Sequence, residues 1–233
     1  MVEGRSKHVF KTWLSERDQA WRDRMEVVAI DGFTGFKTTA EELPDAVVVT
    51  DPFHVVRLAG DALDRCRRRV QQDLHGHRGR AGDPLYSARR TQHTGPGLLT
   101  DKQKTRLDAL FTDDAHAEVE VPHAAYQAMI TAYREPDPAR GRDIMTKLIA
   151  SLSSGVPAAL TELRTLGRTL KQRATDVLAY FDRPGTSNGP TEAINGRLEH
   201  LRGSALGFRN LTNYIARALL ETGGFRPQLH PRL

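Results

Sequence analysis

The sequence is poor in the features that stabilise secreted and membrane proteins. Among its 233 residues there is one cysteine, Cys66, so no intramolecular disulfide can form. No apolar run approaches the roughly 20 residues that a membrane span needs, and the N-terminus lacks the apolar core of a signal peptide. These absences predict a protein of the reducing cytoplasm with no membrane partner.

Positively charged residues are only slightly more numerous than negatively charged ones. The chain has 34 Lys and Arg against 29 Asp and Glu, a formal net charge of +5, which is compatible with nucleic-acid binding without requiring it. The distribution is more informative, because many arginines gather in one stretch. Such a cluster is usually a solvated surface, but beside paired carboxylates it suits a phosphate backbone. These arginines are Arg65, Arg67, Arg68, Arg69, Arg78, Arg80, Arg89 and Arg90.

Two short apolar runs predict neighbouring strands. Residues 25–30 read Met-Glu-Val-Val-Ala-Ile and end at Asp31, and residues 46–50 read Ala-Val-Val-Val-Thr and end at Asp51. A helical stretch over 38–43 between them predicts a parallel crossover, so both aspartates should emerge at the same edge of one sheet. Asp31 could alternatively serve only to turn the chain.

A third acidic residue stands at the predicted start of a helix. Asn188 is a plausible N-cap, and Pro190 suits the first helical turn. Apolar residues recur at helical spacing and predict a buried face, with Glu192 and Asn195 on the roughly opposite face. The alternative is a surface helix whose first-turn glutamate complements the helix dipole. The apolar residues are Ile194, Leu198 and Leu201.

Helical periodicity covers most of the remaining chain. It predicts one helix at 7–21, before the strands, and a long helical region after them that carries no catalytic motif. The glycine- and proline-rich residues 76–96 are predicted to form a flexible loop. Three histidines near Cys66 match no standard zinc-ligand spacing, so no zinc site is predicted. The helices of the long region are predicted at 58–74, 101–110, 124–133, 143–151 and 157–180.

Several motifs, in their order and spacing, resemble the catalytic domain of the bacterial ISL3-family transposases. The agreement covers nearly the whole chain. Members usually have Arg where this chain has Pro52, so one expected basic contact is missing. The motifs that carry the resemblance are Val2-Glu3-Gly4-Arg5-Ser6, Trp13-Leu14, the strand ending in Asp31, Pro44-Asp45-Ala46, the run from Val47 to His54, Ala62-Leu63-Asp64, the run from Asn188 to Gly196, and the run from Gly207 to Tyr214.

The resemblance implies an α/β, mostly helical fold with an RNase H-like core, and a site of two Asp and one Glu that binds Mg²⁺ or Mn²⁺. In this register Asp31 is the second catalytic carboxylate and Glu192 the third, and both are metal ligands. Asp51 and His54 are the supporting pair. Carboxylate oxygens suit these ions, which activate water or a DNA 3′-hydroxyl and stabilise the leaving oxygen. Further supporting residues are Asn188 and Asn195.

The partner implied by the resemblance is double-stranded DNA, both at transposon ends and at the target. Arginines would position its phosphates, although each is equally credible as a surface charge. The arginines expected to contact DNA are Arg65, Arg67, Arg68, Arg69, Arg197, Arg202 and Arg209.

The resemblance also predicts a missing part. The first three strands of such a core, with the first catalytic Asp, should precede the helix at 7–21, where the sequence has only six residues. We therefore expect a partial RNase H-like core over 1–60, a helical insertion over 61–180, and C-terminal helices with the catalytic Glu over 181–233. A strand left unpaired on one side would favour a homo-oligomer or aggregation. The chain would then be an inactive C-terminal part of a transposase.

Three alternatives stay open. In a different register Asp31 is the first carboxylate and Asp51 the second, so that Glu192 completes a triad within the chain. The chain could also be a non-catalytic module that holds DNA through its arginine-rich stretch. Finally, it could be a non-functional remnant with neither activity nor a stable fold.

Overall fold

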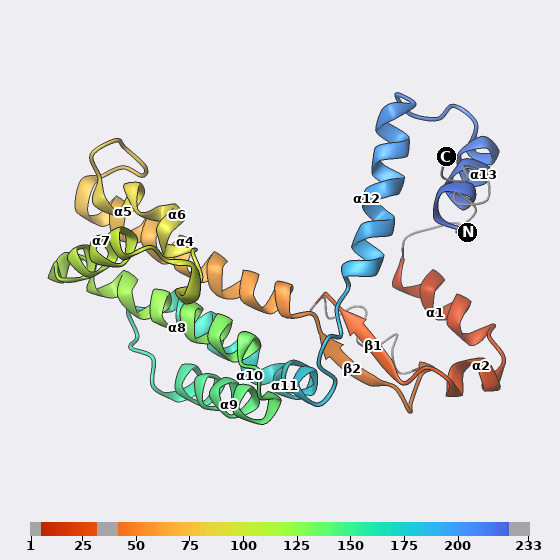
Figure 1. The fold of residues 1–233 in the computed structure, drawn as a ribbon, viewed down its shortest axis with the longest axis horizontal. Coiled ribbons are helices and arrows are strands. Elements are labelled where there is room, and N and C mark those ends of the chain that lie inside the picture. The colour runs from red at the N-terminus through yellow and green to blue at the C-terminus, as the bar shows by residue number, and fades with distance from the viewer. Residues whose placement is uncertain (1–5, 32–41, 224–233) are drawn as a thin grey trace.

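A computed structural model describes residues 6–31 and 42–223 (Figure 1). The sheet of this part of the chain has two parallel strands, β1 (Val27–Ile30) and β2 (Val47–Thr50), with Val27 opposite Val47 and Ile30 opposite Thr50. Both strands consist mainly of β-branched residues, which fit a pleated and partly buried surface. The predicted parallel pairing is confirmed. Most of the helical stretch predicted at 38–43 lies outside the described residues.

The segment before β1 forms two helices rather than the single helix predicted at 7–21. Helix α1 spans Lys7–Ser15, and α2 spans Gln19–Asp23. The break has a local cause, because the Asp18 side chain accepts a hydrogen bond from the Trp21 backbone N–H and so caps a new helix.

A long helix, α4 (Pro52–His75), begins directly after β2 and runs from the sheet to the far end of a helical body (Figure 1). It ends at Gly76, whose φ of +67° is the left-handed conformation that glycine adopts readily. Helix α11 packs against β2 as well as α9, so the helical body and the sheet share a boundary. The other long helices of this body are α7 (Asp101–Phe111), α8 (Ala117–Arg134), α9 (Pro138–Ser154), α10 (Thr161–Gln172) and α11 (Ala174–Asp182).

Apolar side chains from α4, α8, α9, α10 and α11 form one continuous core. The helix predicted at 157–180 is two helices, because the backbone departs from helical geometry at Arg173. Among the side chains with almost no exposed surface are Leu63, Met129, Met145, Leu163 and Val177.

The prediction of a flexible loop over 76–96 is wrong for much of this stretch. It contains α5 (Pro84–Ser87), α6 (Arg89–Gln92) and the start of a 3₁₀ turn at Pro96–Leu98, and a second 3₁₀ turn follows at Asp114–His116. Asp83 caps α5, and Leu85 is fully buried in the core. A capped turn with a buried apolar anchor is held in place in spite of its glycines.

Two helices at the C-terminal side extend away from the sheet (Figure 1). They are α12 (Gly189–Ser204) and α13 (Leu211–Thr222), which contact each other. No residue of α12 is buried, and Ile194 is 39% exposed, so the buried apolar face predicted for this helix is wrong. Within the described residues, no helix is both long and apolar enough to cross a membrane.

Candidate metal centre

Three acidic side chains and one histidine lie at the same edge of the sheet. Asp31 directly follows β1, and Asp51 directly follows β2, so the parallel pairing places both at the carboxyl ends of the strands. His54 lies in the first turn of α4, and Glu192 lies in the first turn of α12. The expected meeting of Asp31 and Asp51 at one edge is confirmed.

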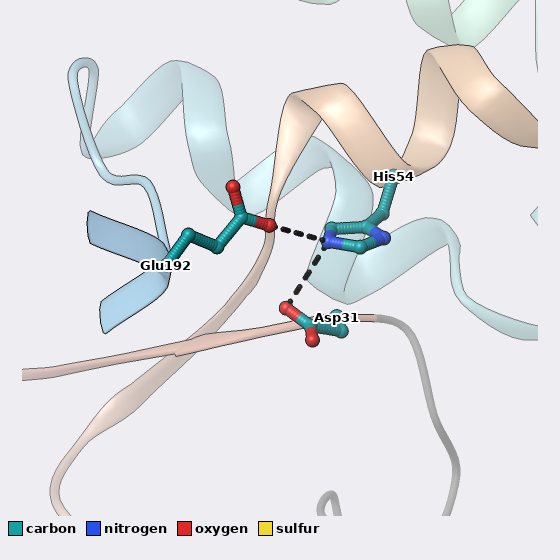
Figure 2. Close-up of side chains that lie close together, drawn as sticks. All are labelled: Asp31, His54 and Glu192. Atoms are coloured by element: carbon teal, nitrogen blue, oxygen red, sulfur yellow. Dashed lines mark hydrogen bonds and ion pairs between the residues drawn. The ribbon is translucent and has the colours of Figure 1, made fainter. Parts of the chain in front are cut away.

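Asp31, His54 and Glu192 converge on one point (Figure 2). The Nε2 atom of His54 is 3.3 Å from Oδ1 of Asp31 and 3.3 Å from Oε1 of Glu192. One ligand atom from each of the three residues lies within 4.8 Å of the other two. The expected proximity of the two carboxylates is therefore confirmed, and they come from segments far apart in the sequence.

Asn188 acts differently from the helix cap predicted for it. It occupies the position before α12, but its side chain makes no capping hydrogen bond. Its Nδ2 instead donates a short hydrogen bond to Oδ1 of Asp31. Asn195 lines a hollow of about 360 Å³ with Asp31, Asn188 and Thr191. Asn188 therefore contacts Asp31, and Asn195 lines the same hollow as Asp31.

Asp51 is the buried anchor of the site, at 4% exposure. Its Oδ1 accepts a hydrogen bond of 2.7 Å from the backbone N–H of Phe53 and so caps α4, while Oδ2 accepts one of 2.6 Å from the backbone N–H of Asn188. Both carboxylate oxygens are engaged with the protein. Asp51 is therefore placed to hold the start of α4 against the start of α12, and it stands outside the group of converging ligand atoms.

The converging side chains are open to solvent. The side chains of Asp31 and Glu192 are 49% and 54% exposed, whereas that of His54 is 19% exposed. Two carboxylates that face one another across a histidine repel each other unless a proton or a cation lies between them. Carboxylate oxygens are the ligands that Mg²⁺ and Mn²⁺ prefer, so the donor set fits either ion, with His54 as a nitrogen neighbour.

Two residues near this site were missed by sequence reasoning. Arg57 and Asp61 line a hollow of about 200 Å³ together with Asp31 and His54. Both are exposed on α4. Their spacing in the sequence could have revealed them, because residues three and seven positions after His54 lie on the same face of a helix as His54.

The arginines expected to contact DNA fall into two groups. On the C-terminal side, Arg197 and Arg209 are exposed, and Arg202 pairs with Glu199 at 2.7 Å. On α4 the four predicted arginines differ strongly in accessibility, and only Arg65 and Arg68 are exposed.

The other two predicted arginines of α4 are engaged with protein partners. Arg67 is 5% exposed and bonds to Asp64 and Gln71, and Arg69 pairs with Glu118 at 2.8 Å and with Glu162 at 3.0 Å. The sequence alone did not show that these two arginines are less accessible than Arg65 and Arg68.

Comparison with known proteins supplies a family context for this geometry. A family model for ISL3-type DDE transposases, described as "Transposase", matches residues 1–218. The chain is 28% identical over 218 aligned residues to the transposase for insertion sequence element IS1557 of Mycobacterium tuberculosis, in strain CDC 1551 / Oshkosh and equally in strain ATCC 25618 / H37Rv. The match includes 83% of this chain and 48% of each relative, so the chain spans about half the length of these curated relatives. No solved structure matches the chain.

Proposed function

Because the chain belongs to the ISL3 family of DDE transposases, we propose that Asp31 and Glu192 are two of the carboxylates with which it binds Mg²⁺ or Mn²⁺ for the cleavage and joining of DNA strands. The observation that carries this proposal is the convergence of Asp31, His54 and Glu192 from β1, α4 and α12, with ligand atoms within 4.8 Å of one another. A surface glutamate that only complemented a helix dipole would have no reason to meet a strand-end aspartate.

Each residue of the site has a distinct task. Asp31 and Glu192 would bind the ion through hard oxygens, and their side chains are the most exposed of the three. Asn188 donates to Asp31 and fixes the orientation of that carboxylate. Asp51 is a positioning residue, since it fixes the backbone of Asn188 and the first turn of α4.

His54 lies between the carboxylates and orients groups around the ion. Its Nε2 either shares a proton with one of them or contributes a nitrogen ligand. When bound, Mg²⁺ or Mn²⁺ supplies Lewis acidity that activates a hydroxyl nucleophile and stabilises a leaving oxygen. Arg57 lies in the same hollow as Asp31 and His54 and is placed to hold a DNA phosphate beside them.

The proposed partner is double-stranded DNA, and the proposed fold context is an RNase H-like core to which β1 and β2 contribute. Among the described residues, β1 pairs with β2 alone and leaves its other edge without a strand. Self-association, which we also propose, would use apolar surface such as Leu211 and Leu220, which are 62% and 49% exposed. A cytoplasmic location remains a prediction from the sequence.

We further propose that the chain alone binds DNA but does not cut it. Two-metal strand transfer needs enough carboxylate charge to hold two divalent cations a few ångströms apart. In the described part of the chain, the converging group has two carboxylates, and Asp51 is not a member of it. The oxygens of Asp51 accept hydrogen bonds from Phe53 and Asn188 instead. This arrangement also argues against Asp51 as a catalytic member of a complete triad.

The test uses the purified chain, a duplex that carries the ends of its own insertion sequence, a supercoiled target plasmid, and Mg²⁺ or Mn²⁺. We expect no nicking and no joining, together with salt-sensitive binding of the duplex. Strand transfer that disappears in both Asp31→Asn and Glu192→Gln would show that another acid of this chain completes the site. Asp61→Asn and Asp51→Asn would then identify that acid.

The second candidate is a DNA-binding module without a metal centre. The exposed arginines of α4 favour this candidate. It also predicts that the chain shows no activity in the strand-transfer assay. The two candidates differ in metal binding, because a simple binding module has no reason to hold Mn²⁺ at Asp31 and Glu192.

A further inference from the structure

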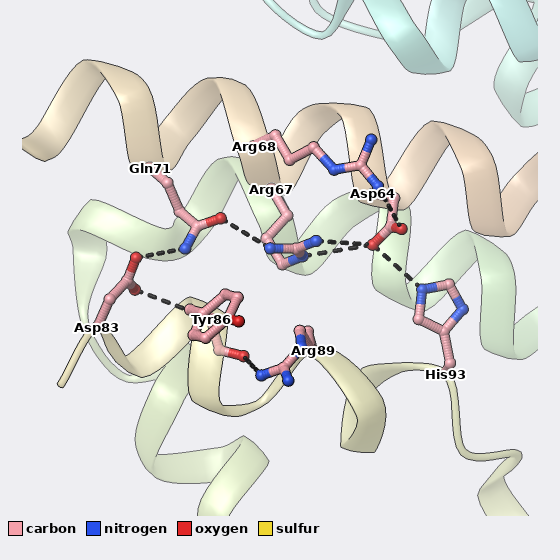
Figure 3. Close-up of polar contacts among 8 residues, drawn as sticks. All are labelled: Asp64, Arg67, Arg68, Gln71, Asp83, Tyr86, Arg89 and His93. Atoms are coloured by element: carbon pink, nitrogen blue, oxygen red, sulfur yellow. Dashed lines mark hydrogen bonds and ion pairs between the residues drawn. The ribbon is translucent and has the colours of Figure 1, made fainter. Parts of the chain in front are cut away.

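A second polar hollow is lined by α4 residues from Asp64 to Gln71, well beyond His54 in the first turn of that helix. Figure 3 shows the polar contacts among residues around it. The hollow has a volume of about 710 Å³ and lies between the C-terminal half of α4 and the segment that contains α5 and α6. Its lining includes five arginines and one aspartate, a difference of +4 before His93 is counted. We call it the arginine hollow; its arginines are Arg67, Arg68, Arg78, Arg89 and Arg90.

The floor of the arginine hollow is a continuous hydrogen-bond network (Figure 3). Arg67 donates to Asp64 at 3.0 Å and to Gln71 at 2.7 Å, and Gln71 donates a short hydrogen bond to Asp83. Asp83 in turn accepts from the backbone N–H of Tyr86 and caps α5. Gln71 and Arg67 are buried, so this network fixes α5 against α4 and gives the hollow a preformed floor.

Among the described residues, Asp64 is the only acidic side chain that lines the hollow, and both of its oxygens accept hydrogen bonds. Its oxygens accept from Arg67, Arg68 and His93. Burial alone would raise the pKa of Asp64, but the hydrogen bonds from Arg67 and His93 outweigh burial and hold its pKa below the usual value. Asp64 therefore stays ionised and pairs with Arg67 and Arg68. No acidic side chain of the lining pairs with Arg78 or Arg90, so these two charges are uncompensated in the described part of the chain.

The rim of the hollow presents cations to solvent. Arg78 and Arg90 are exposed and have no ion-pair partner in the part of the chain that the structure describes, and Arg68 is 48% exposed. Like charges held close together destabilise the folded chain unless an anion joins them. A built floor beneath an uncompensated cationic rim is the expected form of an anion-binding site.

The basic surface continues beyond this hollow. A neighbouring hollow of about 380 Å³ is lined by Arg65, Arg69 and Gln72, and it shares Arg68 and Arg78 with the arginine hollow. Two adjoining cationic cradles with common walls suit an extended polyanion better than a single small anion.

We propose that the arginine hollow binds the phosphodiester backbone of duplex DNA, without reading its bases. The aromatic ring of the hollow is not available for stacking, because Arg89 lies over Tyr86 at 4.0 Å and the loop at Gly79 closes against the same ring. The exposed donors of the rim are guanidinium groups, which recognise phosphate oxygens bidentately, and contacts to phosphate carry no sequence information. The inference rests on the proposed function in taking DNA as the partner, but it needs no metal ion.

The position of the hollow on α4 indicates how a bound duplex would be oriented. Arg68 follows His54 by fourteen residues on one helix, which corresponds to about 20 Å along its axis. That distance equals about six base pairs at 3.4 Å each. A duplex that lies along α4 could therefore contact the arginine hollow and the metal centre together.

The experiment compares two double variants of equal net charge. Arg78→Gln with Arg90→Gln removes both unpaired rim cations, and Arg106→Gln with Arg140→Gln removes two exposed arginines of α7 and α9 as the matched control. Binding of a mixed-sequence duplex is measured by fluorescence anisotropy in EDTA over a series of salt concentrations. Each lost phosphate contact should reduce the slope of log K against log salt by about 0.9, so the rim variant should lose about 1.8 and the control should keep the wild-type slope.

A third variant distinguishes charge from folding. Arg78→Lys with Arg90→Lys retains both charges and should retain most of the wild-type slope. Equal losses in the rim variant and the control, or a wild-type chain that does not bind duplex DNA, would overturn the inference. Tighter binding of a single strand than of the duplex would also overturn it. Because EDTA removes divalent ions, a failed metal centre leaves these results unchanged, so the two proposals can fail separately.

Discussion

Asp51 and Asn188 are joined by a hydrogen bond of 2.6 Å between a buried carboxylate oxygen and a backbone N–H, across a separation of 137 residues. The same carboxylate caps α4 through Phe53. One side chain therefore sets the relative position of the helix that carries His54 and the helix that carries Glu192.

Asp51→Asn should loosen the site without removing a ligand. An amide has one acceptor oxygen, so it can serve Phe53 or Asn188 but not both, and its NH₂ group would face a backbone donor. We expect a loss of about 1–2 kcal/mol in the free energy of unfolding and weaker Mn²⁺ binding. Chemical denaturation and a Mn²⁺ titration of the same sample measure the two effects.

Asp137→Asn is the matched control for this variant. Asp137 also precedes a proline and also caps its helix, α9, by accepting from the N–H two residues on, at 2.9 Å. Asn caps helices about as well as Asp, so stability and Mn²⁺ binding should both stay close to wild type. Equal behaviour of the two variants would mean that the bond from Asp51 to Asn188 has no role in the site.

Gly167→Ala should destabilise the helical body. A Cβ atom at Gly167 would lie 2.0 Å from the backbone oxygen of Leu152, so α9 and α10 would have to move apart. We expect a loss of about 3 kcal/mol from this overpacking. Gly196→Ala, inside α12 with open space around its Cβ position, should instead gain about 0.5–1 kcal/mol. Thermal unfolding of both variants decides the point, and a neutral Gly167→Ala would contradict the close helix contact.

His123 should make the fold sensitive to mild acid. Burial lowers the pKa of His123 from 6.5 to about 4, with a smaller effect from His93. Its Nε2 is 3.2 Å from Nε2 of Gln127, which fits a neutral ring that accepts this bond. The unfolded chain takes up the proton first as pH falls. The stability due to neutral His123 is therefore complete above pH 6.5 and is lost progressively toward pH 4.

The measurement is the free energy of unfolding at pH 7 and pH 5. His123→Gln should show a smaller decrease between these pH values than wild type, because it lacks the group that protonates on unfolding. His200→Gln, at an exposed position of α12, should show the wild-type decrease. An unchanged pH dependence in His123→Gln would contradict the burial of a neutral imidazole.

The strand ends were predictable from sequence because their determinants are local. Two β-branched runs separated by a short crossover allow few arrangements other than a parallel pair, which fixes Asp31 and Asp51 at one edge. The contact of Glu192 with the site at Asp31 was not predictable in this way, since local periodicity carries no information on contacts between residues far apart in the sequence. It followed from the resemblance alone.

The wrong predictions also have physical reasons. Helical spacing of Ile194 and its apolar neighbours predicted a buried face, but spacing cannot show whether a partner surface exists, and α12 has no buried residue. Glycine content predicted a loop after α4, yet a capping aspartate and a buried leucine order part of it. Nothing in the sequence indicated that Arg67 is buried, unlike the arginines next to it. Its partner Gln71 is held by Asp83, and this contact between α4 and the cap of α5 forms only in the folded chain.

Mn²⁺ binding by the isolated chain, followed by electron paramagnetic resonance, tests the proposed metal centre most directly. Wild type should bind Mn²⁺ in competition with Mg²⁺, and both Asp31→Asn and Glu192→Gln should reduce the affinity at least tenfold, a loss of about 1.4 kcal/mol. Glu199→Gln, an exposed glutamate on the same helix as Glu192, should leave binding unchanged. Equal affinity in wild type, Asp31→Asn and Glu192→Gln would contradict a metal site formed by these two carboxylates.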